Sequence, residues 1–351
     1  MMPEKKKDIR KLSAKQLKEF FVANGEKAFR SKQVWEWLWK KSATDFDSMT
    51  NLSLKTRELL KEHFVFNPVE VHTSQLSSDG TVKSAFRLAD GNLVEGVLIP
   101  AEDRMTACVS SQVGCSLSCK FCATGYMDRK RNLDPAEIYD QVVQVKRQAE
   151  ERYDQPLTNI VYMGMGEPLL NYANMMKSIE RITAEDGLGM SPRRITVSTA
   201  GIAKMITKMA DDEVRFRLAL SLHAANDKKR DTIMPINETN TLEALAEALR
   251  YFYEKTKNRI TLEYIVFHNF NDGEEDAREL LAFARKFPCR INIIEYNPIA
   301  EADFQNAEKD KIDAFAEFLE RKGVTVNVRR SRGKDIDAAC GQLANREKEA
   351  S

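Results

Sequence analysis

Short apolar runs alternate with amphipathic segments along the chain from residue 104 onward. The apolar runs predict strands at 105–111, 158–164, 194–199, 216–222, 259–267, 290–296 and 324–329. The segments between them carry apolar residues at helical spacing and predict helices at 135–149, 172–184, 201–210, 241–256, 273–286 and 309–322. This order is typical of βαβ units around a parallel sheet. We therefore predict an α/β fold in which residues 101–345 form a partial (β/α)6 barrel with an irregular C-terminal segment, followed by a tail at 346–351.

Residues 1–67 have a different pattern and predict a small helical accessory domain. Ser13 and Gln16 have the spacing of a capping box, and Ser31 and Ser53 are predicted to begin two further helices. The second helix carries all three tryptophans, Trp35, Trp37 and Trp39. They could stack on nucleic-acid bases, but an aromatic stripe at this spacing more often packs in a core, with Trp37 the most exposed.

Residues 68–100 predict a β-hairpin extension between the two domains. Strands are expected at 69–71, 81–88 and 92–99, with turns at Asp79-Gly80 and Asp90-Gly91. Glu95 lies inside the last of these strands, and the strand pattern alone favours a solvent-facing side chain.

The net charge of +1 does not by itself indicate a polyanionic partner. Basic residues nevertheless cluster at 5–7, 129–131, 193–194 and 329–334, and such clusters either attract phosphate or form a solvated face. The charged N-terminus lacks the apolar segment of a signal peptide, and no run approaches the ~18 apolar residues of a membrane span. We expect a cytoplasmic protein without a membrane partner, whose cysteines act as ligands or catalysts.

Three cysteines, Cys115, Cys119 and Cys122, form a C-x3-C-x2-C run with the aromatic Phe121 before the last. Structural zinc normally takes four protein ligands, and no second pair of Cys or His residues at zinc-site spacing completes such a set. An iron–sulfur cluster held by three cysteines keeps one iron open for a substrate or cofactor. Buried structural cysteines are the alternative, which a polar, glycine-flanked loop fits poorly.

Polar residues end several predicted strands, at the face where barrels of this kind carry their chemistry. The second strand ends in Met163-Gly-Met-Gly-Glu-Pro168, where Gly166 permits close approach and Glu167 offers a carboxylate. The other polar ends are Ser198-Thr199, Ser221-Leu222-His223 and Glu295-Tyr296-Asn297. A simple turn is the alternative for the Gly-Glu-Pro stretch. No G-x-G-x-x-G or G-x4-G-K-[ST] motif supports a dinucleotide or Walker-type site.

Two further cysteines differ in their surroundings. Cys340 lies between small residues after a basic segment, which favours an accessible, reactive thiol. Cys289 follows Phe287-Pro288 at the start of a strand and is interpreted as incidental.

Together, Cys108-Val-Ser-Ser-Gln-Val-Gly-Cys115, the three-cysteine run, Met-Gly-Met-Gly-Glu-Pro, Ser-Leu-His and Asp-Ile-Asp-Ala-Ala-Cys-Gly-Gln-Leu343 resemble the radical S-adenosylmethionine (SAM) adenine-C2 methyltransferases of ribosomal and transfer RNA. The resemblance covers nearly the whole chain. It implies a partial radical-SAM barrel, a [4Fe-4S] cluster and SAM as cofactors, and 23S ribosomal RNA and transfer RNA as substrates. It also implies an electron donor such as flavodoxin or ferredoxin, and nothing in the sequence requires more than a monomer.

The resemblance assigns roles to individual residues. Cys115, Cys119 and Cys122 would hold the cluster. The SAM site would be lined by Gly166, Glu167, Ser198, Ser221, Leu222, His223 and Asn297. Cys340 would accept a methyl group from one SAM, and a radical made from a second SAM would activate that methyl group for addition to carbon 2. Glu95 would be the base, in place of the solvent-facing position expected from the strand pattern, and Cys108 would release the product by attacking the sulfur of Cys340.

Two alternatives to this function are left open. Methylation of carbon 8 of the same adenine keeps the cofactors, although the sequence before Cys340 looks more like the C2 enzymes. A zinc-dependent RNA-binding module without catalysis is the alternative from another class.

Overall fold

The computed structural model describes residues 6–345, so Lys5 of the first basic cluster and the tail predicted at 346–351 lie outside the described residues. One ten-stranded sheet, in the order β14-β13-β12-β11-β10-β9-β6-β5-β4-β3, forms most of the molecule. Its parallel strands are β6 (Arg104–Cys108), β9 (Asn159–Tyr162), β10 (Ile195–Thr199), β11 (Arg217–Ser221), β12 (Ile260–Val266), β13 (Cys289–Glu295) and β14 (Val326–Arg329). The expected α/β fold with a central parallel sheet is confirmed.

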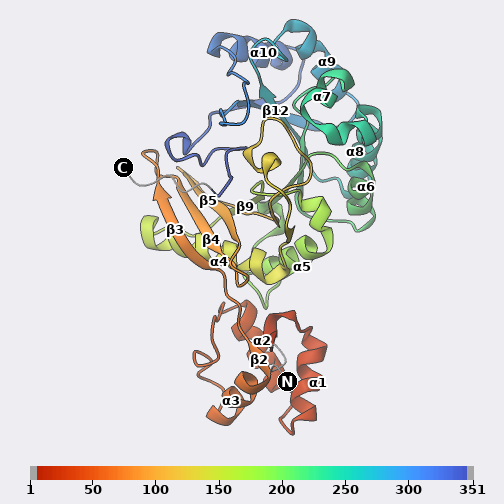
Figure 1. Ribbon diagram of the computed structural model, residues 1–351. Helices are drawn as coiled ribbons and strands as arrows, with labels where there is room; N and C mark the ends of the chain where they lie inside the picture. The colour runs from red at the N-terminus through yellow and green to blue at the C-terminus, as the bar shows by residue number, and fades with distance from the viewer. Residues whose placement is uncertain (1–5, 346–351) are drawn as a thin grey trace.

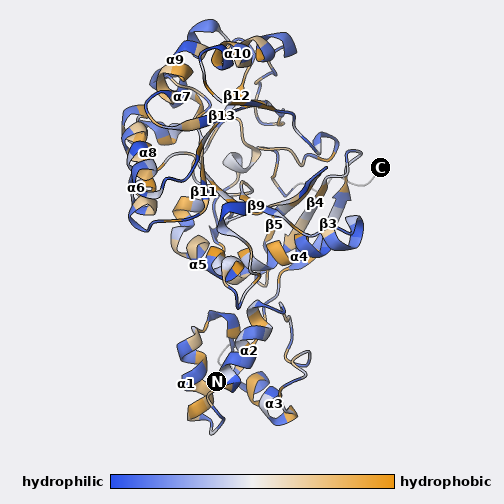
Figure 2. Cartoon of the chain, turned by 180° about the vertical axis from the view of Figure 1, so that it is seen from behind, coloured by the Kyte–Doolittle hydropathy of each residue, from blue (hydrophilic) through white to orange (hydrophobic). Residues whose placement is uncertain are grey.

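Six helices predicted from the sequence connect the parallel strands on the outer side of the curved sheet (Figure 1). They are α4 (Pro135–Tyr153), α5 (Tyr172–Thr183), α6 (Ala203–Asp211), α8 (Leu242–Thr256), α9 (Glu274–Ala284) and α10 (Lys309–Arg321). Each turns an apolar stripe toward the sheet, and the helices show both hydrophobic and hydrophilic surfaces in Figure 2. No helix within residues 6–345 is long and apolar enough to cross a membrane.

Two structural features of the barrel were not predicted. Helix α7 (Asp227–Ile233) lies between β11 and α8, and the strands β7 (Gln112–Val113) and β8 (Arg131–Asn132) pair antiparallel. That short ladder joins the two ends of the loop that carries the three-cysteine run. The loop is therefore anchored at its base.

The extension at 68–100 continues the barrel sheet. Strands β3 (Glu70–Leu76), β4 (Val82–Arg87) and β5 (Leu93–Ala101) are antiparallel, and β5 pairs with β6 at the edge of the parallel part. Glu95 in β5 is only 2% exposed. The solvent-facing position expected from the strand pattern is wrong, because the C-terminal segment covers that face and donates the backbone N–H groups of Ala344 and Asn345 to the Glu95 carboxylate.

The N-terminal module lies at one end of the molecule, below the barrel in Figure 1. It consists of α1 (Ala14–Ala23), α2 (Arg30–Trp39) and α3 (Leu54–His63), and β1 (Lys7–Asp8) pairs with β2 (Phe64–Val65). The predicted capping box at Ser13 and the cap at Ser53 are present. Helix α2 begins at Arg30, one residue before the predicted start at Ser31, and the Ser31 hydroxyl donates to the carbonyl of Ala28.

The tryptophans of α2 attach the module to the barrel. Trp39 is buried and its ring packs edge-on against Tyr139 of α4, with centroids 5.2 Å apart. The indole of Trp35 donates to Asp186, after α5, at 3.0 Å. Trp37 is half-buried. The core interpretation therefore describes Trp39 best, and two of the three rings contact the barrel.

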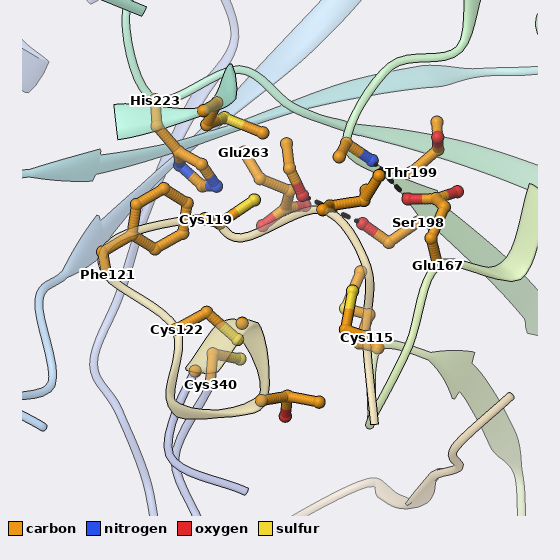
Figure 3. A pocket seen from close by; sticks show the side chains of 18 of the residues that line it. Cys115, Cys119, Phe121, Cys122, Glu167, Ser198, Thr199, His223, Glu263 and Cys340 are labelled. Carbon is orange, nitrogen blue, oxygen red and sulfur yellow. Dashed lines mark hydrogen bonds between the residues drawn. The ribbon is translucent and has the colours of Figure 1, made fainter. Parts of the chain in front are cut away.

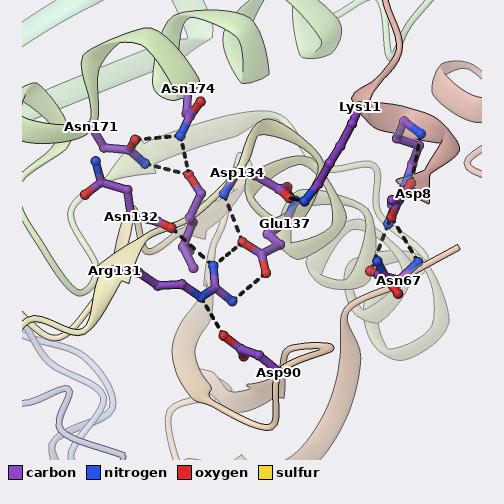
Figure 4. A network of polar contacts seen from close by, with 12 residues as sticks. Asp8, Lys11, Asn67, Asp90, Arg131, Asn132, Asp134, Glu137, Asn171 and Asn174 are labelled. Carbon is purple, nitrogen blue, oxygen red and sulfur yellow. Dashed lines mark hydrogen bonds and ion pairs between the residues drawn. The ribbon is translucent and has the colours of Figure 1, made fainter. Parts of the chain in front are cut away.

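A buried ion pair crosses the same junction. The Arg10 guanidinium contacts Asp140 of α4 at 2.7 Å and Asp8 at 3.1 Å, and it donates to the backbone carbonyl of Asn67 at 2.9 Å. Figure 4 shows Asp8 and Asn67 beside the Lys11–Asp134 pair at this junction. All the polar atoms that this arginine brings into the interior are thus directed at acceptors.

We expect Arg10→Met to destabilise the protein by about 3–5 kcal/mol, because it leaves the buried carboxylates of Asp8 and Asp140 without their cation. Urea unfolding followed by circular dichroism measures the change. Lys15→Met is the matched control: its exposed pair with Glu19 spans 3.9 Å, and its loss is expected to change stability by less than about 1 kcal/mol. Equal stabilities of the two variants would contradict the assigned role of Arg10.

The basic clusters of the barrel are partly neutralised by ion pairs. Arg131 contacts Asp90 at 2.6 Å and Glu137 at 2.7 Å (Figure 4). Arg330 and Lys334 both contact Glu295. These clusters therefore fit the solvated-face interpretation better than a dedicated phosphate site.

Candidate functional site

A cavity opens at the C-terminal ends of the parallel strands. Its empty space, with open solvent at the mouth included, is about 910 Å³. Its wall includes the three cysteines of the C-x3-C-x2-C run and residues that follow β9, β10, β11 and β14. Figure 3 shows Cys115, Cys119 and Cys122 facing the same space as Glu167, Ser198 and Cys340. The structure thus brings together groups that lie far apart in the sequence.

The cysteine loop folds back on itself between β7 and β8. Gly114 has φ +75°, and a Cβ there would lie 2.2 Å from the carbonyl oxygen of Asp128. Burial raises the pKa of all three thiols, to about 11 for Cys115, and for Cys119 the two neighbouring cysteines raise it further. Three thiolates at these positions would repel one another, and a bound cation would offset that repulsion and favour the thiolate forms.

Glu167 forms the wall opposite the cysteine loop. It is 3% exposed, and its carboxylate accepts the backbone N–H groups of Ala200 at 2.8 Å and Leu169 at 3.0 Å. Burial raises its pKa, and these hydrogen bonds oppose the shift. The preceding Gly166 has φ +91° and packs against Gln112, whose side-chain oxygen accepts the Glu167 N–H at 2.8 Å.

Gly166→Ala is expected to disrupt this wall. A Cβ at residue 166 would lie 2.4 Å from the Cβ of Gln112, so Gln112 and Glu167 must shift. The control is Gly189→Ala, at φ +67° with no atom within 4 Å of the new Cβ, which carries only the ~1–2 kcal/mol backbone strain. We expect the affinity for SAM, measured by equilibrium dialysis, to fall by roughly tenfold for Gly166→Ala and to be unchanged for Gly189→Ala. Equal affinities would remove Gly166 from the site.

Residues at the ends of β10 and β11 form the rear of the cavity. The hydroxyls of Ser198 and Ser221 lie 3.4 Å apart. His223 is buried, with its Nδ1 accepting the backbone N–H of Ile265 at 3.1 Å and its ring 4.7 Å from that of Phe121. Burial and, secondarily, Arg230 lower its pKa to about 3. The imidazole is therefore neutral at physiological pH and contributes shape and hydrogen bonding rather than charge.

Four residues singled out from the sequence lie beside the cavity without lining it: Glu95, Cys108, Leu222 and Asn297. Leu222 is fully buried in the hydrophobic core, and its backbone carbonyl accepts from Arg230. Asn297 donates from Nδ2 to the carbonyl of Cys340 at 3.3 Å, while its buried Oδ1 has no hydrogen-bond partner. An unpartnered acceptor of this kind is available to a bound ligand.

The C-terminal segment brings Cys340 into the cavity. Gly341 accepts the N–H of Ala123 through its carbonyl at 2.7 Å, and Thr124 donates from its hydroxyl to Leu343 at 2.5 Å. Cys340 lies beside Cys122 in Figure 3. Its side chain is solvent-exposed because it faces the open cavity, yet the surrounding protein still raises the pKa of its thiol.

Arg329 and Glu263 form a charged pair at the cavity that the sequence did not reveal. The guanidinium Nη1 of Arg329 lies 3.1 Å from Oε2 of Glu263, and both residues line the cavity. Arg329 favours the thiolate forms of both Cys108 and Cys340, against the effect of burial, which raises the pKa of Cys108 to about 12. The signal was present in the sequence as a basic residue ending a strand, but it was assigned to a surface cluster.

Family models match two parts of the chain. Residues 7–66 match the N-terminal domain of the ribosomal RNA large subunit methyltransferase, and residues 109–281 match the radical SAM superfamily. The first match coincides with the helical module, and the second contains the cysteine loop and the strand ends that form the cavity.

Known proteins resemble the chain over nearly its whole length. A probable dual-specificity RNA methyltransferase RlmN of Cytophaga hutchinsonii is 67% identical over 98% of this chain and 94% of that protein. The protein of the same description from Christiangramia forsetii is 58% identical over 98% and 97%. The crystal structure of a radical SAM methyltransferase from Sphaerobacter thermophilus superposes with a TM-score of 0.91 at 38% identity, covering 96% of this chain and 99% of that one.

Proposed function

The chain belongs to the dual-specificity RNA methyltransferases of the radical SAM superfamily, and we propose that it methylates carbon 2 of a specific adenine in 23S ribosomal RNA and in transfer RNA. The observation that carries this proposal is the meeting of Cys340 with the three-cysteine loop at one cavity. A cluster site alone fits many radical SAM reactions. A further thiol within that site provides a carrier for the methyl group.

The donor set fits the [4Fe-4S] cluster that radical SAM enzymes use. Within residues 6–345 no three His, Cys, Asp or Glu side chains converge as they would on a single metal ion. A cubane cluster does not require this, because each cysteine binds a different iron. Cys115, Cys119 and Cys122 would therefore hold three irons, and the fourth would be open to SAM. When bound, the cluster supplies the electron for reductive cleavage of SAM.

The opposite wall fits SAM. We assign its binding to Gly166, Glu167, Ser198, Ser221, Leu222, His223 and Asn297. Glu167 offers a buried carboxylate to the ammonium group, and Asn297 offers the unpartnered Oδ1. Leu222 contributes through its backbone and core packing, since its side chain does not reach the cavity. Neutral His223 adds no charge that would repel the sulfonium.

Cys340 carries the methyl group in the proposed reaction. Carbon 2 of adenine is electrophilic, so it does not displace a methyl group from SAM directly. The Cys340 thiolate does so instead, and its sulfur becomes a thioether. After this carbon gives one hydrogen atom to the radical that a second SAM would supply, it bonds to carbon 2 and links protein to RNA. Glu95 takes the carbon-2 proton, and the one electron that the adduct loses would pass to the cluster. The Cys108 thiolate then attacks the sulfur of Cys340 and breaks its bond to the transferred carbon. That carbon takes up a proton and becomes the methyl group of the released RNA, and a disulfide is left between the two cysteines.

The remaining partners follow from this reaction. The target adenine must leave its stack to reach the cavity, and the N-terminal module is assigned to holding the RNA. A reductant such as flavodoxin or ferredoxin supplies the electron. A monomer is sufficient, and the RNA substrates place the reaction in the cytoplasm.

Mass spectrometry of nucleosides tests the proposal. Ribosomal and transfer RNA lacking the modification are incubated with the reconstituted protein, SAM and a reductant, and 2-methyladenosine is the expected product from both. Formation of 8-methyladenosine instead would overturn the assignment of carbon 2. A colourless anaerobic preparation that contains zinc, without iron or sulfide, would favour the zinc-dependent RNA-binding module.

A further inference from the structure

Lys83 is a buried lysine whose charge is directed at Glu95. Its side chain is 6% exposed, and Nζ lies 3.5 Å from Oε1 of Glu95, whose side chain is 3% exposed. Lysine is almost never buried unless it is paired. An ammonium and a carboxylate buried this close together stabilise each other, because neither group is surrounded by water.

The strand register places this pair on the same face as a reactive thiol. Lys83 lies opposite Val97 in the β4–β5 ladder, and Glu95 is two residues from Val97 on β5. Val97 in turn lies opposite Cys108 in the β5–β6 ladder. Opposed residues share a face and residues two apart return to it. Lys83, Glu95 and Cys108 therefore project from one face of the sheet. The C-terminal segment that carries Cys340 covers this face.

The other hydrogen bonds to the Glu95 carboxylate come from the C-terminal segment that carries Cys340. Its Oε2 accepts the N–H groups of Ala344 at 2.8 Å and Asn345 at 3.1 Å. To act as the base, the carboxylate has to face the adenine instead of these two amides. Lys83 belongs to the sheet and stays with Glu95 when that exchange occurs.

We propose that Lys83 is a positioning residue that pairs with the Glu95 carboxylate and orients it for removal of the carbon-2 proton. The inference rests on the proposed role of Glu95 as base. In this step the proton moves from carbon 2 to a carboxylate oxygen of Glu95, and the electron pair of the broken C–H bond stays in the ring. Lys83 keeps its three protons and exchanges no atom. Without Lys83, the Glu95 carboxylate loses the one charged contact that remains when the backbone N–H groups of Ala344 and Asn345 give way to the adenine.

Lys83→Met tests the inference through the fate of the protein–RNA adduct. We expect SAM cleavage, measured as 5′-deoxyadenosine, to continue at the rate of the unmodified protein. The yield of methylated adenosine is expected to fall by roughly 10- to 100-fold, and a covalent adduct should accumulate on denaturing gels. Lys83→Arg retains the cation and should restore most of the product. Lys146→Met, at an exposed pair with Glu150, is the matched control and should turn over normally.

Glu95→Gln separates this inference from the proposed function. If Glu95→Gln fails to trap the adduct, Glu95 is not the base and the proposed mechanism fails with it. If Glu95→Gln traps the adduct but Lys83→Met turns over cleanly, only the role of Lys83 is overturned. A merely structural Lys83 would lower SAM cleavage and product together in Lys83→Met, with no adduct, and that outcome would also overturn the inference.

Discussion

Cys340→Ala is expected to abolish methylation of RNA while the iron and sulfide content of the protein stays unchanged. The substitution removes the sulfur that carries the methyl group, and no neighbouring cysteine replaces it: Cys122 is assigned to the cluster and Cys108 lies beneath the cavity. Because Cys340 is exposed to the cavity, its loss creates no void in the core, and stability is expected to change by less than about 1 kcal/mol. The expected loss of product is therefore complete, and a loss of folded protein does not account for it.

Three measurements define this result. Iron and sulfide analysis reports the cluster, formation of 5′-deoxyadenosine reports SAM cleavage, and nucleoside mass spectrometry reports the product. Cys289→Ala is the matched control, because Cys289 lies at the start of β13, does not line the cavity, and has a thiol that donates to the carbonyl of Ala284. It should retain full activity. Residual methylation by Cys340→Ala would show that the methyl group reaches adenine by another route.

Local signals in the sequence were sufficient for most elements. The parallel strands and their helices were predicted within a few residues, because each strand is a continuous apolar run and each helix has an amphipathic period. The caps at Ser13 and Ser53 are likewise local, since each side chain accepts an N–H three residues ahead. Helix α2 was placed less well because Phe29 at its N-terminus forms no side-chain cap.

Contacts between distant segments could not be predicted in this way. Glu95 was expected in solvent because its partners are 249 and 250 residues away, in the C-terminal segment. The pair between Arg329 and Glu263 is invisible for the same reason. Strands β7 and β8 contain two residues each, which is too short for a period of two to be recognised. The site residues at the strand ends could be predicted because the fold class alone places those ends together.

Cys108 and Cys340, the two cysteines assigned to catalysis, lie in structurally different parts of the fold. Cys108 ends β6 in the sheet, whereas Cys340 lies on the irregular segment that closes over it. The thiol assigned to contact RNA is therefore on the part of the chain with few regular hydrogen bonds, and the thiol assigned to attack Cys340 is fixed in the sheet. Arg329 ends β14, at the opposite end of the row of parallel strands from β6, and favours the thiolate of either one.

Cys108→Ala is expected to trap protein covalently bound to RNA. Every step up to restoration of the adenine ring uses Cys340 and Glu95, so the adduct forms at the normal rate. Release requires a second thiolate to attack the sulfur of Cys340, and Cys108 lies near enough for the charge of Cys340 to add to burial in raising the pKa of its thiol. Turnover should fall to a single event per protein molecule, a loss of roughly 10³-fold or more in multiple-turnover assays.

The adduct is measured as a shifted band on denaturing gels that disappears on digestion with ribonuclease. Cys108→Ser, which keeps the volume of the side chain but is a far weaker nucleophile at neutral pH, should trap the same species, so a packing defect at the end of β6 does not account for it. The double variant with Cys340→Ala should show no adduct, because the link to RNA is made through the sulfur of Cys340. Clean multiple turnover by Cys108→Ala would mean that another thiol releases the product, and the pairing of Cys108 with Cys340 would have to be abandoned.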